Sequence, residues 1–431
     1  MSEQQTTVRI IHGRLLDAEH DGSVTASLLL QGGHIAAIGA EAELGDVDRV
    51  IDASGCLVSP GFIDLNCNLR EPGNGQKGNI ASETLAAARG GFSTVCASPA
   101  TSPVNDSSAV TNLISDVAET QSPIRVLPLG AATRGLEGEL LSDMAGLSRA
   151  GCVALSNAGA QMRNSRILRR CMAYARTFDL TLMLAPVNQA LAADGYAHDG
   201  LVTSRLGLLG IPEVAETTAV MELLLLAEET GVRLHLNQLS CGRSVAMVAD
   251  AQKRGVAVTA DVAMHQLLFT EDALAGFDSR FHVRPPLRTE ADRQGLLAGV
   301  RDGVIGAIVS QHQPHDSAAK QAPLGATEPG LSTVESVLSM GLELVNDGEL
   351  SLQQLVSSLT YGPAGVLGET SALRVGQRAD LCIFDPDASW QADDSSLVSI
   401  GKHAPVRHCP LKGVVRHTLC AGNEAWGPGG D

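Results

Sequence analysis

Two amide side chains follow an apolar stretch near the start of the chain. The run GCLVSPGFIDL is followed at once by Asn66, Cys67 and Asn68. Positions i and i+2 of a strand point to one side, so Asn66 and Asn68 face a common space while Cys67 faces the core. Paired side chains at a strand end commonly hold a metal ion, but zinc prefers the imidazoles of a His-x-His pair and binds amides poorly.

The element that carries these asparagines is the first of eight predicted strands. Patterns typical of amphipathic helices lie between the strands, for example at 82–91 and at 212–231, where a proline begins the helix and a glycine closes it. Eight strands alternating with helices predict an α/β fold, a (β/α)8 TIM barrel, with its chemistry at the carboxyl ends of the strands. The predicted strands lie at 56–65, 92–98, 124–130, 152–157, 180–186, 232–238, 256–262 and 304–311.

Both chain ends have a different pattern, of short β segments without helical periodicity. The segments VRIIHGRLL and SLLLQGGHIAAIG lie near the start, and GQRADLCIFDP and KGVVRHTLCAGNEAW lie near the end. We predict that the two ends pair into one small β-sandwich. The predicted domains are therefore 1–56 plus 370–431 for the sandwich and 57–369 for the barrel.

Composition and charge exclude several classes of function. No apolar run reaches the ~18 to 20 residues that a membrane span needs, and MSEQQTTVRI lacks the features of a secretory signal, so we expect a cytoplasmic protein. A net charge of -17 argues against binding to nucleic acid. The nine cysteines include no C-x-x-C spacing, which argues against a disulfide framework or a zinc knuckle.

The stretch SPGFIDLNCNLREPG, residues 59–73, carries a resemblance to a known family. It is similar to the first-strand signature of dihydroorotases and of the wider amidohydrolase superfamily, PGFID followed by His-x-His-x-Arg-Glu/Asp-Pro-Gly. The resemblance extends over most of the chain. It implies a barrel enzyme that interconverts carbamoyl aspartate and dihydroorotate, with zinc polarising the amide and activating a water.

Six positions that the resemblance assigns to metal binding or proton transfer carry other side chains. None of the six titrates near neutrality or binds zinc well. We therefore expect no catalytic residue, no metal and no cofactor. The six are Asn66 and Asn68 for two histidines, Asn157 for a bridging acid or carbamoylated lysine, Ala185 and Gln238 for two further histidines, and Gln311 for the proton-shuttling aspartate.

Two alternatives keep a function for the barrel mouth. One is a hydrolase that is metal-free or has a rearranged metal site among the histidines 235, 265, 312 and 315. The other is a small-molecule sensor with a vestigial pocket formed by Arg70, His265 and His315, in which the Arg70 fork would grip a carboxylate. A structural ion pair of Arg70, with Glu71 or with a neighbouring loop, competes with that role. Arg284 stands where the family has an asparagine.

The resemblance also implies a role without catalysis. Some bacterial aspartate carbamoyltransferases assemble with a dihydroorotase-like chain that lacks the zinc histidines. By that likeness, this chain would be a non-catalytic subunit of such a complex in pyrimidine biosynthesis. Its partner would be the aspartate carbamoyltransferase catalytic chain, with six copies of each in a hetero-oligomer.

Overall fold

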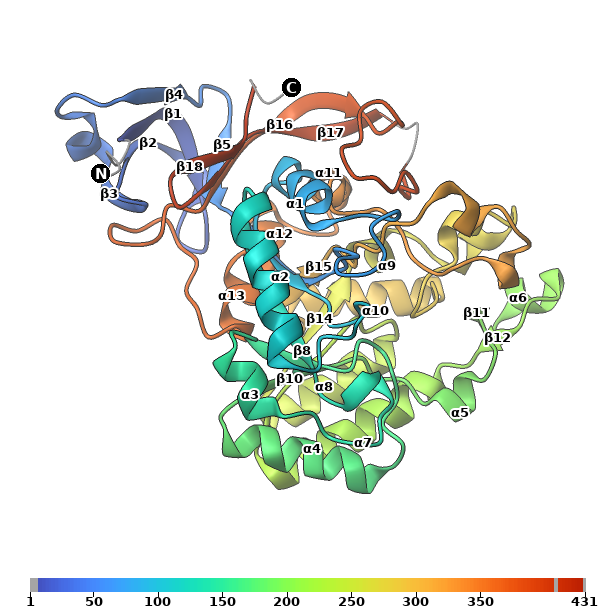
Figure 1. The fold of residues 1–431 in the computed structure, drawn as a ribbon. Helices are drawn as coiled ribbons and strands as arrows, with labels where there is room; N and C mark the ends of the chain where they lie inside the picture. The colour runs from blue at the N-terminus through green and yellow to red at the C-terminus, as the bar shows by residue number, and fades with distance from the viewer. Residues whose placement is uncertain (1–6, 407–409, 429–431) are drawn as a thin grey trace.

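A closed barrel of parallel strands forms the centre of the protein (Figure 1). The computed structural model describes residues 7–406 and 410–428. Its barrel sheet has the order β15-β14-β13-β10-β9-β8-β7-β6. Cys67 and His312 form a parallel bridge between the first and last strands, and Asn68 N donates to His312 O at 2.8 Å, so the sheet closes. The predicted TIM barrel is confirmed. Its strands are β6 Phe62–Cys67, β7 Phe92–Ala97, β8 Arg125–Ala131, β9 Ala154–Ser156, β10 Thr181–Leu184, β13 Arg233–Leu236, β14 Val258–Ala263 and β15 Ala307–Val309.

Helices that follow the barrel strands pack around the outside of the sheet (Figure 1). The long helix α7 ends at Gly231, whose φ of 68° is the left-handed conformation that favours glycine at a helix end. The surrounding helices are α1 Ile80–Arg89, α2 Ser108–Gln121, α3 Met144–Arg149, α4 Ser165–Thr177, α7 Val214–Thr230, α8 Gly242–Lys253, α10 Glu290–Arg301, α11 Val337–Asn346, α12 Leu352–Leu359 and α13 Tyr361–Val366.

Three long connections at the carboxyl ends of the strands carry short elements of their own. The connection after β10 projects from the barrel as an arm (Figure 1), and the sequence patterns did not predict it. The arm contains α5 Gln189–Ala192, β11 Ala197–His198, α6 Leu201–Leu206 and β12 Gly210–Ile211. The other two connections contain α9 Met264–Leu268, η3 Glu271–Leu274 and η4 Ser279–Phe281 after β14, and η5 Ser317–Lys320 and η6 Leu324–Ala326 after β15; a further 3-10 turn, η2 Arg134–Leu136, follows β8.

The two chain ends build a second sheet beside the barrel. Its order is β18-β17-β16-β5-β1-β2-β3, with β4 pairing with β1, and it folds over an apolar core of its own. Antiparallel pairing of β16 with β5 joins the two ends of the chain, which confirms their predicted association. The elements are β1 Val8–Leu16, β2 Asp21–Gln31, β3 His34–Ile38, η1 Gly39–Glu43, β4 Arg49–Asp52, β5 Leu57–Pro60, β16 Leu381–Gln391, β17 Pro410–Cys420 and β18 Asn423–Trp426.

The prediction of one barrel strand at 56–65 was wrong, because this segment forms two strands that belong to different sheets. β5 pairs with β1 and β16, whereas β6 pairs with β7. The crossover lies at Gly61, whose N–H donates to Asp380 O at 2.8 Å and whose Cα packs so closely on Ser93 that a side chain would collide with it. The domain boundaries at 57 and 370 stay a prediction, and residues 1–6, 407–409 and 429–431 of the predicted sandwich lie outside the described residues.

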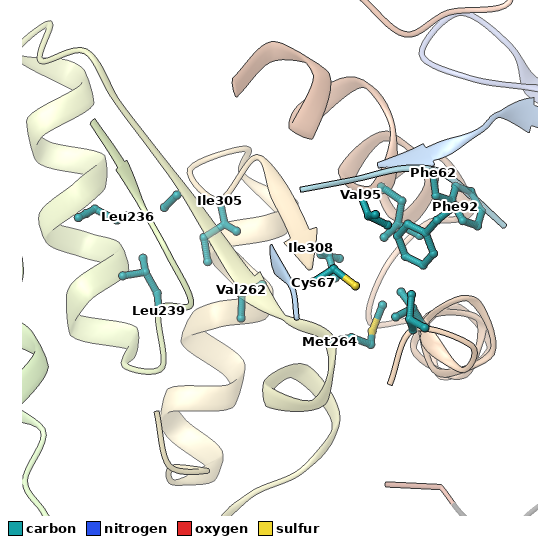
Figure 2. Packing of buried hydrophobic residues seen from close by; sticks show 14 of the residues in the cluster. Phe62, Cys67, Phe92, Val95, Leu236, Leu239, Val262, Met264, Ile305 and Ile308 are labelled. Atoms are coloured by element: carbon teal, nitrogen blue, oxygen red, sulfur yellow. The ribbon is translucent and has the colours of Figure 1, made fainter. Parts of the chain in front are cut away.

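Aromatic and aliphatic side chains bind the barrel to the end sheet (Figure 2). Phe62 and Phe92 meet edge to face at 5.7 Å between ring centroids, and Phe384 of β16 lies 6.3 Å from Phe62. Cys67 is buried near Ile308 in this core, which confirms its predicted orientation (Figure 2). The eight described cysteines are free and buried, and Cys409 lies outside the described residues. Within those residues, no helix is long and apolar enough to cross a membrane.

Candidate functional site

A cavity of about 390 Å³ opens at the carboxyl ends of the barrel strands. Six positions were predicted to have lost a metal ligand or a proton carrier, and five of them line this cavity. The five lie at the ends of β6, β10, β13 and β15. These five are Asn66, Asn68, Ala185, Gln238 and Gln311. The loop residues beside them include Ser98, Ala100, Ala158, Asn237, Arg284, Arg288 and His312. The topology therefore gathers the predicted positions around one space, as expected for a barrel.

Asn66, near the end of β6, and Asn68, just after it, line the same cavity, as their spacing predicted. Asn68 Oδ1 accepts the backbone N–H of Arg70 at 3.1 Å, in a turn where Arg70 has a φ of 64°. This is a common use of asparagine in turns, where its amide stands in for a backbone carbonyl. The Asn68 oxygen therefore supports the chain that leaves β6.

Asn157 differs from the other five positions, because it does not line the main cavity. It is buried, its Oδ1 accepts the Thr133 hydroxyl at 2.8 Å, and its Nδ2 donates to Ala160 O at 2.9 Å. It lines a neighbouring cavity of about 130 Å³. The residue in place of the bridging acid is thus a brace between the loops after β8 and β9.

Within the described residues, three buried amide atoms of the main cavity have no hydrogen-bond partner: Asn237 Oδ1, Gln238 Nε2 and Gln311 Oε1. The other end of the Gln311 amide is used, since Nε2 donates to Arg284 O at 2.7 Å. Gln238 and Gln311 both have a φ of 50°, in the left-handed region that is strained for residues other than glycine. The strand ends therefore present amides to the cavity from a fixed, strained backbone.

Two of the histidines considered for a rearranged metal site have both ring nitrogens occupied. His235 lies 2.7 Å from Thr259 Oγ1 and 2.9 Å from Asp261 Oδ2. His312 Nδ1 accepts the Thr333 N–H at 3.1 Å, so the proton lies on Nε2, which donates to Glu83 Oε2 at 2.8 Å. Both rings serve as hydrogen-bonded supports beneath the loops.

The three residues of the predicted vestigial pocket are Arg70, His265 and His315. All three are described residues, and none lines the cavity. Arg70 and His315 do meet, at 3.2 Å between Nη2 and Nε2, and burial together with Arg70 lowers the pKa of His315 to about 4. Neither nitrogen of His265 has a hydrogen-bond partner in the described part of the chain, and burial lowers the pKa of His265 to about 4.

Arg70 makes no ion pair with Glu71, and it contacts a neighbouring loop through hydrogen bonds. Its Nε donates to Pro314 O at 2.9 Å, and the Glu71 carboxylate instead accepts the Ile80 N–H at 2.9 Å, at the start of α1. A carboxylate near the first turn of a helix is favourable because it meets unpaired N–H groups there. Arg70 is thus committed to the loop after β15.

Sequence reasoning missed the carboxylates that hold the mouth in place. Asp64 accepts the N–H groups of Asn66 and Ser310 at 3.2 and 3.1 Å and also the Ser310 hydroxyl, joining the first strand to the last. Burial raises the pKa of Asp64 to about 6. Asp261 Oδ1 accepts the Gln238 N–H at 2.6 Å. The sequence does hold a sign of such a carboxylate, because Asp64 is a charged residue inside the apolar strand segment FIDL.

Glu83 of α1 is the most heavily bonded of these carboxylates. It is fully buried and accepts from Ser82 at 2.8 Å, His312 at 2.8 Å, Ser399 Oγ at 2.6 Å and Ile400 N at 3.1 Å. Burial alone would raise the pKa of Glu83, but the His312 and Ser399 hydrogen bonds outweigh it and lower the pKa. Glu83 ties the helix, the last barrel strand and the C-terminal loop together.

The donor set at the mouth does not fit a zinc ion. The five lining positions offer amides and a methyl group, whereas zinc sites use thiolate, imidazole or carboxylate. In the described part of the chain, no group of three or more His, Cys, Asp or Glu side chains could hold a metal ion. The arrangement supplies hydrogen bonds and cationic charge, and the five predicted positions that line it include neither a carboxylate nor an imidazole.

Comparison with known proteins gives the family. A protein of Pseudomonas putida named dihydroorotase-like protein is 46% identical over 98% of this chain and 100% of its own. The chain belongs to the dihydroorotase-like family. The family profile described as dihydro-orotase-like matches residues 55–244. A dihydroorotase-like protein of Pseudomonas aeruginosa is also 46% identical, over 97% of this chain and 99% of its own, and a protein of Syntrophotalea carbinolica named dihydroorotase is 38% identical over 96% and 98%.

Solved structures agree with the dihydroorotase-like fold. The L-hydantoinase of Arthrobacter aurescens superposes with a TM-score of 0.87 at 25% identity, covering 97% of this chain and 96% of its own. A dihydropyrimidinase of Brevibacillus agri superposes with a TM-score of 0.82 at 22% identity, covering 97% and 94%. The barrel with its appended end sheet is therefore the architecture of the amidohydrolase superfamily.

Proposed function

We propose that this dihydroorotase-like chain is a non-catalytic member of its family that serves as a structural subunit of an aspartate carbamoyltransferase complex in pyrimidine biosynthesis, in the cytoplasm. One observation carries the proposal. At the barrel mouth, amides and a methyl group occupy every position where the family resemblance expects a zinc ligand or a proton carrier. These side chains support the absence of catalysis, and the family resemblance suggests the partner chain.

The loss of catalysis follows from the chemistry of the replacements. A structural zinc site is worth ~10 to 16 kcal/mol of binding, from deprotonated thiolate or neutral imidazole ligands. Neutral amide oxygens cannot offset the desolvation of a divalent cation in that way. Gln311 has no exchangeable carboxyl proton, so it cannot relay one between a water and a leaving nitrogen.

A role for the fold itself is supported by how firmly the strand ends are held. The buried carboxylates of Asp64, Glu83 and Asp261 fix the strand ends through hydrogen bonds. The two relatives at 46% identity are named dihydroorotase-like protein, and the relative at 38% is named dihydroorotase. A maintained surface for a partner chain accounts for an intact barrel without catalytic groups.

The test is to mix the purified chain with the aspartate carbamoyltransferase catalytic chain from the same organism. We expect a stable complex, on the scale of six copies of each chain, with carbamoyltransferase activity that depends on it. We expect no dihydroorotase turnover by either the free chain or the complex. Light scattering after gel filtration measures the mass of the complex. Assays of carbamoyltransferase and dihydroorotase activity test the other two expectations.

Two results would contradict the proposal. Failure to associate at micromolar concentrations would remove the structural role. Turnover of a cyclic amide that is abolished by a chelator, or by His312→Ala, would instead support the hydrolase with a rearranged metal site. Turnover that resists chelation would support metal-free hydrolysis.

A further inference from the structure

We propose that the outer face of helix α7, together with the arginines of the neighbouring helix α4, is the surface on which the partner chain docks. The occupant that fits this surface is an amphipathic helix of the partner, with an apolar stripe and acidic side chains beside that stripe. The inference rests on the proposed function, since it takes the carbamoyltransferase chain as the partner. It adds where that chain binds and what it must offer.

Helix α7 has apolar side chains on both its inner and its outer face. The inner face packs into the main core through buried residues such as Val220 and Leu224. On the outer face, Val214, Met221 and Leu225 are 43%, 46% and 56% exposed. A helix with apolar residues on all sides is normally covered on all sides. The outer face of α7 is therefore a surface that a second helix can cover.

The exposed side chains of α7 form one line along the helix. With the exposed Thr218 included, Val214, Thr218, Met221 and Leu225 follow one another at intervals of four, three and four residues. This is the spacing of side chains through which one helix packs along another. From Val214 to Leu225 the line runs for about three turns, or about 16 Å. The spacing therefore favours a helix as the occupant.

The helix beside α7 supplies positive charge. Helices α4 and α7 are in contact, at the end of the molecule away from the end sheet (Figure 1). Helix α4 has four arginines and no acidic residue, in a chain whose net charge is -17. A basic surface on an acidic protein attracts acidic segments of a partner. The four arginines are Arg166, Arg169, Arg170 and Arg176, and all are exposed.

Part of this positive charge is available to a partner. Arg169 pairs with Glu229 of α7, at 3.0 Å between Nε and Oε2, so the arginine row lies alongside the apolar line. Within the described residues, the side chains of Arg166 and Arg170 make neither an ion pair nor a hydrogen bond. Each of these two guanidinium groups can bind a carboxylate through two parallel hydrogen bonds.

A second copy of this chain is a poorer match for the surface than a different chain. A symmetric contact through α7 would bring two copies of the basic α4 into one interface. Like charges at an interface oppose association. An acidic helix from a different chain would instead cover the apolar line and neutralise the free arginines.

The experiment measures binding of the full-length chain to the carbamoyltransferase catalytic chain from the same organism, by titration calorimetry. Leu225→Glu places a charge in the apolar line, and we expect it to weaken binding at least about tenfold. Leu113→Glu is the matched control, since Leu113 is 45% exposed on a different helix, α2. It should change the affinity less than about twofold.

A second pair of variants tests the charge. Arg166→Glu combined with Arg170→Glu should weaken binding at least about tenfold, because the free cations become anions that repel an acidic helix. Lys412→Glu is the control, since Lys412 is an exposed cation on β17 of the end sheet. It should change the affinity less than about twofold. Binding of the parent chain should weaken as salt rises, because salt screens exposed charges.

A cross-link identifies the occupant. The eight described cysteines are buried, so Thr218→Cys adds an exposed thiol within the apolar line for a photoreactive benzophenone label. We expect this label to react with a segment of the carbamoyltransferase chain that has apolar residues at helical spacing and Asp or Glu beside them, as read by mass spectrometry. The parent chain treated with the same label is the control. Cross-linking to a second copy of this chain, or to a basic segment of the partner, would contradict the proposal.

The docking surface and the proposed function can be told apart when either fails. If the parent chain does not bind the carbamoyltransferase chain, the proposed function is wrong and the docking surface with it. If the parent chain binds, but Leu225→Glu binds as tightly as Leu113→Glu or the arginine variant as tightly as Lys412→Glu, the docking surface alone is wrong. Melting temperatures of the variants close to that of the parent show that the changes act on binding, as expected for exposed positions.

Discussion

Replacement of an imidazole by an amide at a strand end changes what the barrel mouth can hold. An imidazole offers a lone pair to a metal, whereas an amide offers one weak oxygen donor and two N–H groups. In this chain, some of the amides support loops, as Asn68 and Asn157 do, and others face the cavity without a partner, as Gln238 does. The amides at these strand ends thus divide into those that brace loops and those with atoms open to the cavity.

The buried His265 makes stability depend on pH. Burial lowers its pKa from 6.5 to about 4, so below pH 6.5 the unfolded chain binds a proton that the native chain does not. Stability is therefore lost as the pH falls from 6.5 toward 4, by about 2 kcal/mol at pH 5 from this residue. We expect His265→Leu to raise the free energy of unfolding by about that amount more at pH 5 than at pH 8. Urea unfolding at the two pH values measures it.

The exposed His34 provides the control for that experiment. His34→Gln should leave the pH dependence as in the parent chain, since the side chain is exposed on β3. An equal response of both variants would show that burial of His265 is not the cause.

Removal of the Glu83 carboxylate is expected to be severely destabilising. Glu83→Ala leaves the His312 and Ser399 donors and the Ile400 N–H without their acceptor in a buried site, which we expect to cost about 3 to 5 kcal/mol. Glu119→Ala, on the exposed face of α2, should change stability by less than about 0.5 kcal/mol. Urea unfolding at neutral pH compares the two. A loss below 1 kcal/mol for Glu83→Ala would refute the role given to this carboxylate, since that is within the cost of one ordinary hydrogen bond.

At the scale of elements, helix α1 joins the barrel to the end sheet. The Arg89 guanidinium lies 4.6 Å from the Trp390 ring centroid and 5.9 Å from that of Trp426, and it pairs with the buried Glu335. We expect Arg89→Leu to cost about 1 to 3 kcal/mol and to shift tryptophan emission, because a cation is removed from both rings. Fluorescence spectra and urea unfolding measure the two effects. Arg149→Leu, exposed on α3, should leave emission unchanged, and an unshifted Arg89→Leu spectrum would contradict the contact.

The sequence predicted the regular elements well, because each barrel strand is an apolar run and the segment after it has the periodicity of an amphipathic helix. It failed where a contact distant in sequence decides the structure. The split between β5 and β6 depends on β16, more than 300 residues away, and β16 draws Leu57–Pro60 into the end sheet. The arm after β10 is made of elements too short to produce a periodic pattern.

The candidate site shows the same division between local and distant information. The direction of Asn66 and Asn68 followed from strand alternation, and five of six predicted positions do line the cavity. The strand pattern did not show that Arg70, His265 and His315 would lie outside the cavity lining, or that Arg70 would contact His315. The contacts of Glu83 and Arg284 depend on loops far away in sequence, such as 399–400 and 195.

At the scale of the whole molecule, the end sheet has an apolar core of its own and also contributes side chains to the main core of the barrel. Phe384 and Leu411 of the end sheet pack in the same buried cluster as barrel residues, and the Thr418 hydroxyl donates to Ala88 O at 2.6 Å. We therefore expect the two parts to unfold together. Both tryptophans lie in the end sheet, so their emission reports that sheet, while far-ultraviolet circular dichroism reports mainly the barrel helices. Coincident urea transitions by the two probes are the expected result, and separated midpoints would contradict it.

The central claim is that the mouth of this barrel holds no catalytic metal. The most direct measurement is the zinc content and dihydroorotase rate of the purified chain, after loading with zinc and removal of the excess by gel filtration. We predict much less than one zinc per chain and no turnover of dihydroorotate or carbamoyl aspartate above a protein-free blank. One zinc per chain together with turnover would contradict the claim.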